Sequence, residues 1–420
     1  MSPRRAALAA LTVIAAVAVI AHLPPVSRWL VRSLIDRVEG PLGLDIETGD
    51  VRAWPAGLSA TMRDVRIRYV QDAEPFLTAD ALTIDLPFAA IGNRSRIGDI
   101  TLARPHIDID GLIRWLDSRP PSQTPNPTVP RIDRVIVTDA TLQSERDGLA
   151  FTFPALAVAM RSTVTTPLAG DLTSAGATLR LGDVVFRDLA LDGTLRYDGA
   201  IGIERARLAS HDTVLDLAGR IGMREGDRAM SLTVGGTIAP LRMVLAPYLT
   251  HPVLDGAVTI DGRVEGSFVA PELIATLTSP DVTIDGARSG PLSTRITLTR
   301  QHLIVGDTTW DSLFGGRATG QARFEFNDAR DATIDIDVRS VATLPIITIV
   351  DPTWPMFRGR ATGTLRIHGP LATTLRPQVT SDMVLVKADA SPLATSGRVS
   401  FTLDPARWTA TLRGVTIRST

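Results

Sequence analysis

The fold is decided by two stretches of strict alternation, Val65-Arg66-Ile67-Arg68-Tyr69 and Leu82-Thr83-Ile84-Asp85-Leu86. They are followed by two shorter alternating stretches, Ile100-Thr101-Leu102 and Ile107-Asp108-Ile109. Because successive side chains of a strand point to opposite faces, each stretch predicts a strand with one apolar and one polar face. No convincing helical period separates these stretches, so residues 50–110 predict a sheet built strand after strand.

The alternation continues from residue 132 nearly to the end of the chain, with turn signals such as Asp192-Gly193 and Asp198-Gly199 between the strands. We expect the apolar positions to share one face of the sheet and to line it. These positions are Val65, Ile67, Leu82, Ile84, Leu86, Ile100, Leu102, Ile107, Ile109, Leu179, Leu181, Leu215, Leu217, Val258, Ile260, Ile296, Leu298, Phe324, Phe326, Ile334, Ile336, Leu365 and Ile367.

The totals exclude several classes of protein. At 420 residues the chain exceeds the usual length of one domain, so several modules or one long repeat are expected. The net charge of −1 argues against nucleic acid as a partner, because phosphate binding needs a basic surface. The absence of cysteine excludes disulfides, thiolate metal sites and a cysteine nucleophile.

Seven segments follow from the changes in pattern along the chain. We expect a membrane anchor in 1–24, an amphipathic helix leading into the sheet in 25–48, and a first β module in 49–118. A Pro-rich linker or excursion occupies 119–131, and a β ladder occupies 132–238. Two repeat units, 239–340 and a shorter 341–420, each contain a strand bounded by glycines, Gly256–Gly266 in the first and Gly359–Gly369 in the second. Such self-similarity is typical of an array in which each unit stacks on its neighbour.

The first segment contains an uncharged run from Ala6 to Leu23, preceded by Arg4 and Arg5. Eighteen residues are at the short end of what crosses a bilayer, and the arginines would remain in the cytoplasm. A cleavable signal peptide ending near Ala16-Val17-Ala18 is the alternative. The apolar positions that would contact the membrane are Ala6, Leu11, Val13, Ile14, Val17, Val19, Ile20 and Leu23. Both alternatives place the bulk of the chain beyond the inner membrane.

The sequence contains no nucleotide-binding glycine loop and no Gly-x-Ser-x-Gly nucleophile motif. Its six histidines are scattered, and none lies four residues from another, so we expect no metal site and no cofactor. The pairs Asp108/Asp110 and Asp335/Asp337 flank isoleucine, and their parity places them on the polar face of strands. We therefore expect no catalytic residues and no enzyme activity.

The order of these segments resembles the AsmA-like, TamB-like family of envelope-spanning, bridge-like lipid-transfer proteins. The likeness is carried by a Trp54-Pro55-x-Gly57-Leu58 turn, by Met62-Arg-Asp-Val-Arg-Ile67, and by the strands that follow up to Ile109. It is a profile of apolar positions and turn residues, without an invariant catalytic group. It implies an uncleaved inner-membrane anchor, a cytoplasmic N-terminus and a periplasmic β-rich groove for phospholipid.

Together these observations predict a mainly β fold: an elongated, twisted antiparallel sheet curled into an apolar-lined groove, with an N-terminal transmembrane helix and a few short helices. The expected function is a conduit that carries phospholipid between the inner and outer membranes. The alternative is a scaffold that assembles outer-membrane β-barrel proteins by strand addition, with such a barrel as its partner. A compact sandwich with its apolar faces packed together is the plain structural alternative.

Overall fold

A computed structural model describes residues 32, 35, 39, 43–54, 59–85, 96–118, 131–146, 149–162, 167–181, 184–198, 200–222, 229–238, 241–242, 253–267, 270–326, 331–343, 345, 359–370, 378–387, 393–403 and 415–419. Within these ranges the chain is mainly β, with 24 strands, the helix α3 (Ile109–Asp117) and the short 3-10 helix η3 (Leu313–Gly315). The expected fold class, mainly β with few helices, is confirmed at this level.

The chain divides into two compact units, one made of residues 1–180, 186–208 and 218–228 and the other of 181–185, 209–217 and 229–420. The first twelve strands are β1 (Leu44–Glu47), β2 (Val51–Trp54), β3 (Ser59–Tyr69), β4 (Leu77–Asp85), β5 (Arg96–Ala103), β6 (His106–Asp108), β7 (Arg131–Arg146), β8 (Leu149–Arg161), β9 (Leu168–Leu181), β10 (Val184–Tyr197), β11 (Ala200–Ala209) and β12 (Val214–Gly222). The others are β13 (Ala229–Ile238), β14 (Leu254–Asp255), β15 (Val258–Ser267), β16 (Pro271–Ile284), β17 (Ala287–Leu298), β18 (His302–Trp310), β19 (Arg317–Glu325), β20 (Asp331–Ala342), β21 (Gly359–Pro370), β22 (Gln378–Lys387), β23 (Leu393–Leu403) and β24 (Val415–Ser419).

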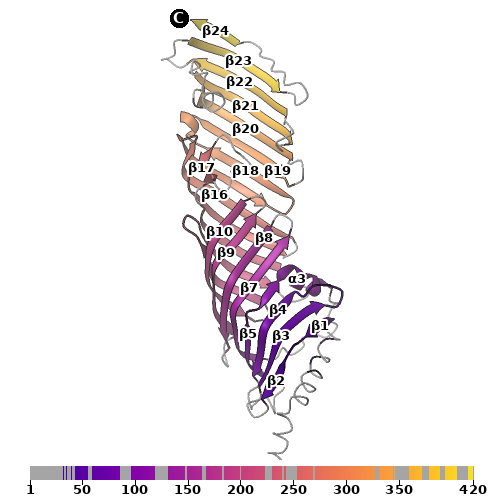
Figure 1. The fold of residues 1–420 in the computed structure, drawn as a ribbon. Coiled ribbons are helices and arrows are strands. Elements are labelled where there is room, and N and C mark those ends of the chain that lie inside the picture. Colours follow the sequence, from indigo (N-terminus) through magenta and orange to yellow (C-terminus); the bar gives the residue numbers. More distant parts are fainter. Residues whose placement is uncertain are drawn as a thin grey trace, which may run out of the picture. The chain divides into compact units, whose positions relative to one another are not determined.

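In the first unit, β3 is the strand to which the N-terminal strands attach. It pairs antiparallel with β1 and β2 along its two halves, and with β4 along most of its length (Figure 1). β4 then pairs with β5 and β6, which follow each other in the chain and are separated by Arg104 and Pro105. Two short strands thus share one long neighbour on each side, an arrangement that the alternating pattern did not predict.

The sheet of the first unit is mixed, which corrects the expectation of a wholly antiparallel sheet. β5 and β6 both run parallel to β7. Parallel neighbours need a connection that carries the chain back to the same end, and in the sequence α3 and residues 118–130 lie between β6 and β7. Period-two alternation is the same in parallel and antiparallel strands, so the sequence could not reveal this pairing.

Helix α3 begins at Ile109, two residues before the helical turns that the sequence predicted over 111–117. The Asp108 side chain accepts hydrogen bonds from the backbone N–H groups of Asp110 and Gly111 and thereby caps the helix. Ile109 is consequently the first residue of α3 and not a strand residue. Asp110 is buried and accepts bonds from Ser144 Oγ at 3.0 Å and from the Glu145 N–H at 2.8 Å. The expectation of a solvated strand face was therefore wrong for Asp110, which is buried in α3, while Asp108 is the last residue of β6 and caps the helix.

In the second unit the pairing is antiparallel throughout the described strands. β13 pairs with β15, β14 with β16, and each strand from β15 to β24 pairs with the next one in the sequence, as the orange to yellow strands of Figure 1 show. Such nearest-neighbour order is what local turns between alternating strands produce.

The predicted membrane anchor, Ala6 to Leu23, lies outside the described residues. No helix in the described part of the chain is long and apolar enough to cross a membrane. The described residues of the expected amphipathic helix include Ile35, which is helical and buried against Val51, Met62 and Val65. At Ile35 this segment thus packs on the sheet.

Candidate functional site

An unbroken column of small or aliphatic residues crosses ten strands of the second unit. Each member is the direct cross-strand partner of the next. The column runs Val234, Gly262, Ala275, Ile296, Val305, Ala322, Ile334, Ile367, Val379, Leu403. Directly opposed side chains are the unit of packing on a sheet face, so the column forms one continuous apolar surface.

This apolar surface is incompletely covered. At its β13 end Val234, Ala275 and Ile296 are buried, and they pack with neighbours that include Leu215 and Leu217. Further along the same face, Ile334 and Ile367 remain half-buried although each has a strand on both sides. A side chain in the middle of a sheet is hidden fully only when a second layer lies over it. The described residues therefore leave much of this surface within reach of a ligand.

A second column, on the opposite face of the same ten strands, is entirely polar. It runs Thr237, Thr259, Thr278, Ser293, Thr309, Thr319, Asp337, Thr364, Asp382, Ser400. The Arg398 guanidinium lies beside it and holds the pKa of Asp382 below its usual value, chiefly by a direct hydrogen bond. The two columns show that the faces keep their character over the described ladder, and the polar one suits contact with water.

The alternation is broken inside several strands by two successive exposed residues. In β20 the exposed pair Arg339–Ser340 separates Val338 from Val341, and both valines are buried in one cluster. The second residue of the pair, Ser340, has φ 53°, a left-handed backbone conformation. The pairing of β20 with β21 shifts register at the same point. This is a β-bulge, which bends a strand and increases its twist while returning the apolar side chains to one face.

The same break in the alternation, with a left-handed second residue, recurs in the first unit. In β3 the exposed Arg63 and Asp64 separate the buried Met62 and Val65, and Asp64 has φ 51°, although the register between β3 and β4 does not shift there. In β7 the corresponding residue is Asp139, with φ 56°, at a register shift between β7 and β8. Asp and Asn tolerate this conformation better than most side chains with a Cβ. A polar pair flanked by apolar residues was the signal in the sequence, but its meaning depended on knowing that the strand continued.

The predicted lining residues divide by burial as follows. Val65, Val258, Ile260 and Ile296 are buried. Those that are half-buried are Ile67, Leu82, Ile84, Ile100, Leu102, Ile107, Ile109, Leu179, Leu215, Leu217, Leu298, Phe324, Ile334, Ile336, Leu365 and Ile367. Phe326 lies beyond the end of β19 and is exposed, Leu86 lies outside the described residues, and only the backbone of Leu181 is described.

The structure brings some of these residues into direct register and adds others that the sequence reading missed. Leu82 faces Leu102 and Ile84 faces Ile100 in the first unit. Ile336 faces Leu365 in the second. Seven members of the apolar column were missed, and three of them, Gly262, Ala275 and Ala322, are small. Small residues carry little hydrophobic signal, and only the cross-strand register assigns them to the face.

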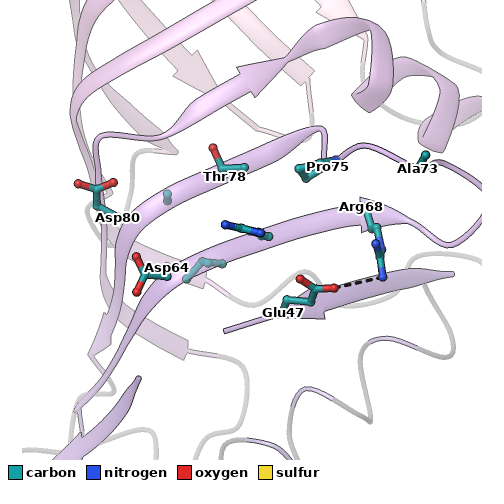
Figure 2. A pocket seen from close by; sticks show the side chains of 10 residues that line it. Glu47, Asp64, Arg68, Ala73, Pro75, Thr78 and Asp80 are labelled. Carbon is teal, nitrogen blue, oxygen red and sulfur yellow. Dashed lines mark ion pairs between the residues drawn. The ribbon is translucent and has the colours of Figure 1, made fainter. Parts of the chain in front are cut away.

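A separate hollow of about 410 Å³ lies beside β1, β3 and β4 in the first unit (Figure 2). Most of the side chains that line it are polar, and several of these are charged and paired. Arg68 contacts Asp45 and Glu47, and the hydrogen bond to Asp45 raises the pKa of Arg68. Asp80 accepts a 2.6 Å bond from the Nε of Arg104. The hollow is thus a largely polar surface, and the residues that line it in the described chain include no histidine, serine or cysteine.

Comparisons with models of known protein families, with curated proteins and with solved structures find no match for this chain. Within the described ranges, no group of three or more His, Cys, Asp or Glu side chains is placed to hold a metal ion. The continuous apolar face is the candidate functional site of this chain.

Proposed function

We propose that this chain is a passive conduit that carries phospholipid between the inner and outer membranes of a two-membrane envelope. The apolar run at the N-terminus would anchor it in the inner membrane, and the strands would lie in the periplasm. The observation that carries the proposal is the apolar column across ten strands, which is only half-buried at Ile334 and Ile367, with a polar column on the other face. No covalent step, catalytic residue or cofactor is part of the proposal.

The dimensions of the apolar column suit an acyl chain. Strands lie about 4.8 Å apart, so ten strands give a track of about 43 Å, longer than the hydrocarbon core of a bilayer at about 30 Å. Transfer of one methylene from water to an apolar surface contributes about 0.8 kcal/mol. A tail that stays on this track avoids the cost of entering water, while the head group remains solvated. Passage then needs no chemical step, only a continuous apolar surface.

The bulges support a trough rather than a flat sheet. A β-bulge bends its strand, and left-handed residues lie at register shifts in β7, β18 and β20. At Ser340 the bulged residue is exposed while its apolar neighbours Val338 and Val341 share a cluster. We infer that the apolar side is the concave one, which would enclose the tails on three sides.

The test is photo-crosslinking in cells with p-benzoylphenylalanine at two adjacent positions of β21 in the full-length chain. Ile367 belongs to the apolar column, and His368 is exposed on the polar face, where its Nδ1 lies 3.1 Å from Thr333 Oγ1. We expect phospholipid adducts, identified by mass spectrometry, at Ile367 and not at His368. Equal labelling at both positions, or none at either, would contradict the proposal. Protein adducts alone would favour the alternative, an assembly factor for outer-membrane β-barrel proteins.

A further inference from the structure

The first strand of the sheet, β1, has an edge that β3 does not cover. The Gly43 carbonyl accepts the Val70 N–H at 3.1 Å, and the register continues with Asp45 opposite Arg68. In an antiparallel pair, alternate residues exchange backbone bonds with the partner strand. Asp45 therefore bonds to β3, while the N–H and C=O of Ile46 point the other way. Such outward groups are a template on which another chain can add a strand.

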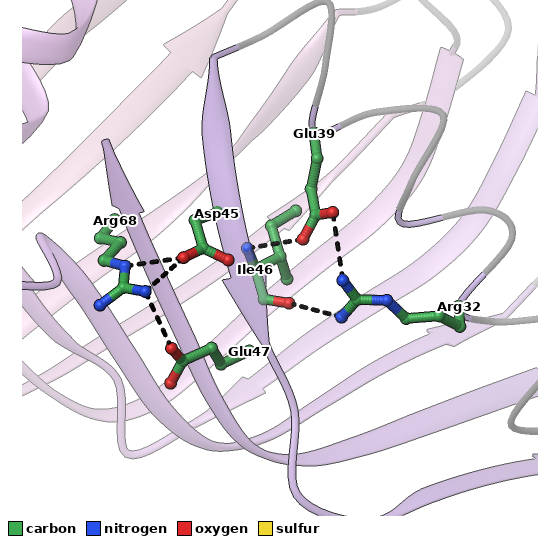
Figure 3. Close-up of polar contacts among 6 residues, drawn as sticks. All are labelled: Arg32, Glu39, Asp45, Ile46, Glu47 and Arg68. Atoms are coloured by element: carbon green, nitrogen blue, oxygen red, sulfur yellow. Dashed lines mark hydrogen bonds and ion pairs between the residues drawn. The ribbon is translucent and has the colours of Figure 1, made fainter. Parts of the chain in front are cut away.

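Two side chains from the preceding helical segment occupy this template at Ile46. Glu39 Oε1 accepts the Ile46 N–H at 2.9 Å, and Arg32 Nη1 donates to the Ile46 carbonyl at 3.4 Å (Figure 3). Arg32 and Glu39 also contact each other at 3.4 Å. One acceptor and one donor thus take the places that the backbone of an adjacent strand would fill.

The position of these two side chains is fixed by an apolar residue between them. Ile35 is 7% exposed and packs in the cluster that contains Val51 and Val65. Residues at i, i+3 and i+7 lie along one side of a helix, which is the spacing of Arg32, Ile35 and Glu39. The same segment therefore covers part of the apolar face and the backbone edge beside it.

We infer that Arg32, Ile35 and Glu39 form an edge cap that prevents β1 from pairing with β1 of a second copy of this chain. Two copies of Leu44–Glu47 can pair antiparallel about a two-fold axis. The acidic side chains that would meet there, Asp45 and Glu47, are both contacted by Arg68, so their repulsion is reduced. The cap goes beyond lipid transfer: it closes this edge to the strand addition that the assembly-factor alternative would use.

The test combines two measurements on the full-length chain in detergent. Hydrogen exchange, resolved to single residues by electron-transfer fragmentation, reports the Ile46 amide, with the Asp45 amide as internal reference. In R32A/E39A we expect about tenfold faster exchange at Ile46, with no change at Asp45, because one bond to a backbone amide is lost without opening the ladder. Sedimentation analysis is expected to show a reversible dimer for R32A/E39A and a monomer for the unaltered chain.

Two further variants separate the cap from general effects. E39Q keeps an acceptor oxygen and is expected to retain slow exchange at Ile46 and to remain monomeric. D281A/R288A removes an exposed ion pair of 2.6 Å in the second unit and is expected to change neither measurement. Unchanged exchange at Ile46 in R32A/E39A, or a monomer at every concentration, would overturn the inference. Lipid adducts on β21 do not depend on this edge, so failure of the cap and failure of the conduit are distinguishable.

Discussion

A charge placed on the apolar face is the most direct test of the proposed conduit. We choose Leu365→Asp because the structure gives the cross-strand partners of Leu365 on both sides. Leu365 lies on β21 between its partners Ile336 on β20 and Ser381 on β22. It is half-buried, so the new carboxylate can reach water and the strand can still form. The loss of half the burial of a leucine costs about 1 kcal/mol of folding stability, which a chain of this length can tolerate.

The effect on lipid passage is expected to be larger than the effect on stability. One strand spacing of about 4.8 Å corresponds to about four methylenes of an extended tail. Without apolar contact over that length, the tail loses about 3 kcal/mol at this strand. Since each 1.36 kcal/mol of barrier is a factor of ten in rate, we expect transfer to fall by about two orders of magnitude.

The assay is transfer of fluorescent phospholipid from donor to acceptor vesicles by the purified full-length chain, with thermal unfolding measured in parallel. Thr362→Asp is the matched control, because Thr362 is exposed on the same strand and its Oγ1 accepts the Ser340 N–H, a role that a carboxylate retains. We expect Thr362→Asp to transfer lipid at close to the normal rate. Equal rates for the two variants would refute the assignment of the faces, and an unimpaired Leu365→Asp would refute the continuous track.

Three further outcomes test the architecture. Ile260→Ala should lower the free energy of unfolding by about 2–5 kcal/mol, because Ile260 is 5% exposed in an apolar cluster. Ile274 lies on the polar face of the adjacent strand, so Ile274→Ala should lower it by about 1 kcal/mol or less. Denaturant titrations measure both values. Asp139→Val should cost about 1–2 kcal/mol more than Asp139→Gly, since φ 56° suits glycine and not a β-branched residue; equal stabilities would contradict the bulge. The lowered pKa of Asp382 means that its ion pair with Arg398 contributes stability above the ordinary carboxyl value of 3.8 and loses it as the pH falls through the lowered pKa. Asp382→Asn should therefore have a lower unfolding temperature than the unaltered chain at pH 7, and this difference should vanish in strong acid.

The sequence predicted which residues of β21 share a face, because the alternation of faces is a local property of a strand. In β21, Leu365 and Ile367 alternate with Arg366 and His368, and the structure gives these pairs opposite faces. The two-residue alternation ceases to predict the structure where a side chain hydrogen-bonds to the nearby backbone and ends the strand. Asp108 has the parity of a strand residue, but its carboxylate caps α3, and the strand ends there.

The alternation of apolar and polar residues by itself determined that this protein is mainly β and which side chains share a face within each strand. This is possible because the two-residue period is a property of the extended backbone alone. Three features were decided only by tertiary structure: the parallel pairing of β5 with β7, the membership of Gly262 and Ala322 in the apolar column, and the contacts of Glu39 with Ile46. Each depends on partners that are distant in sequence. Register, crossover and packing decide which residues become partners, so a local pattern cannot identify them.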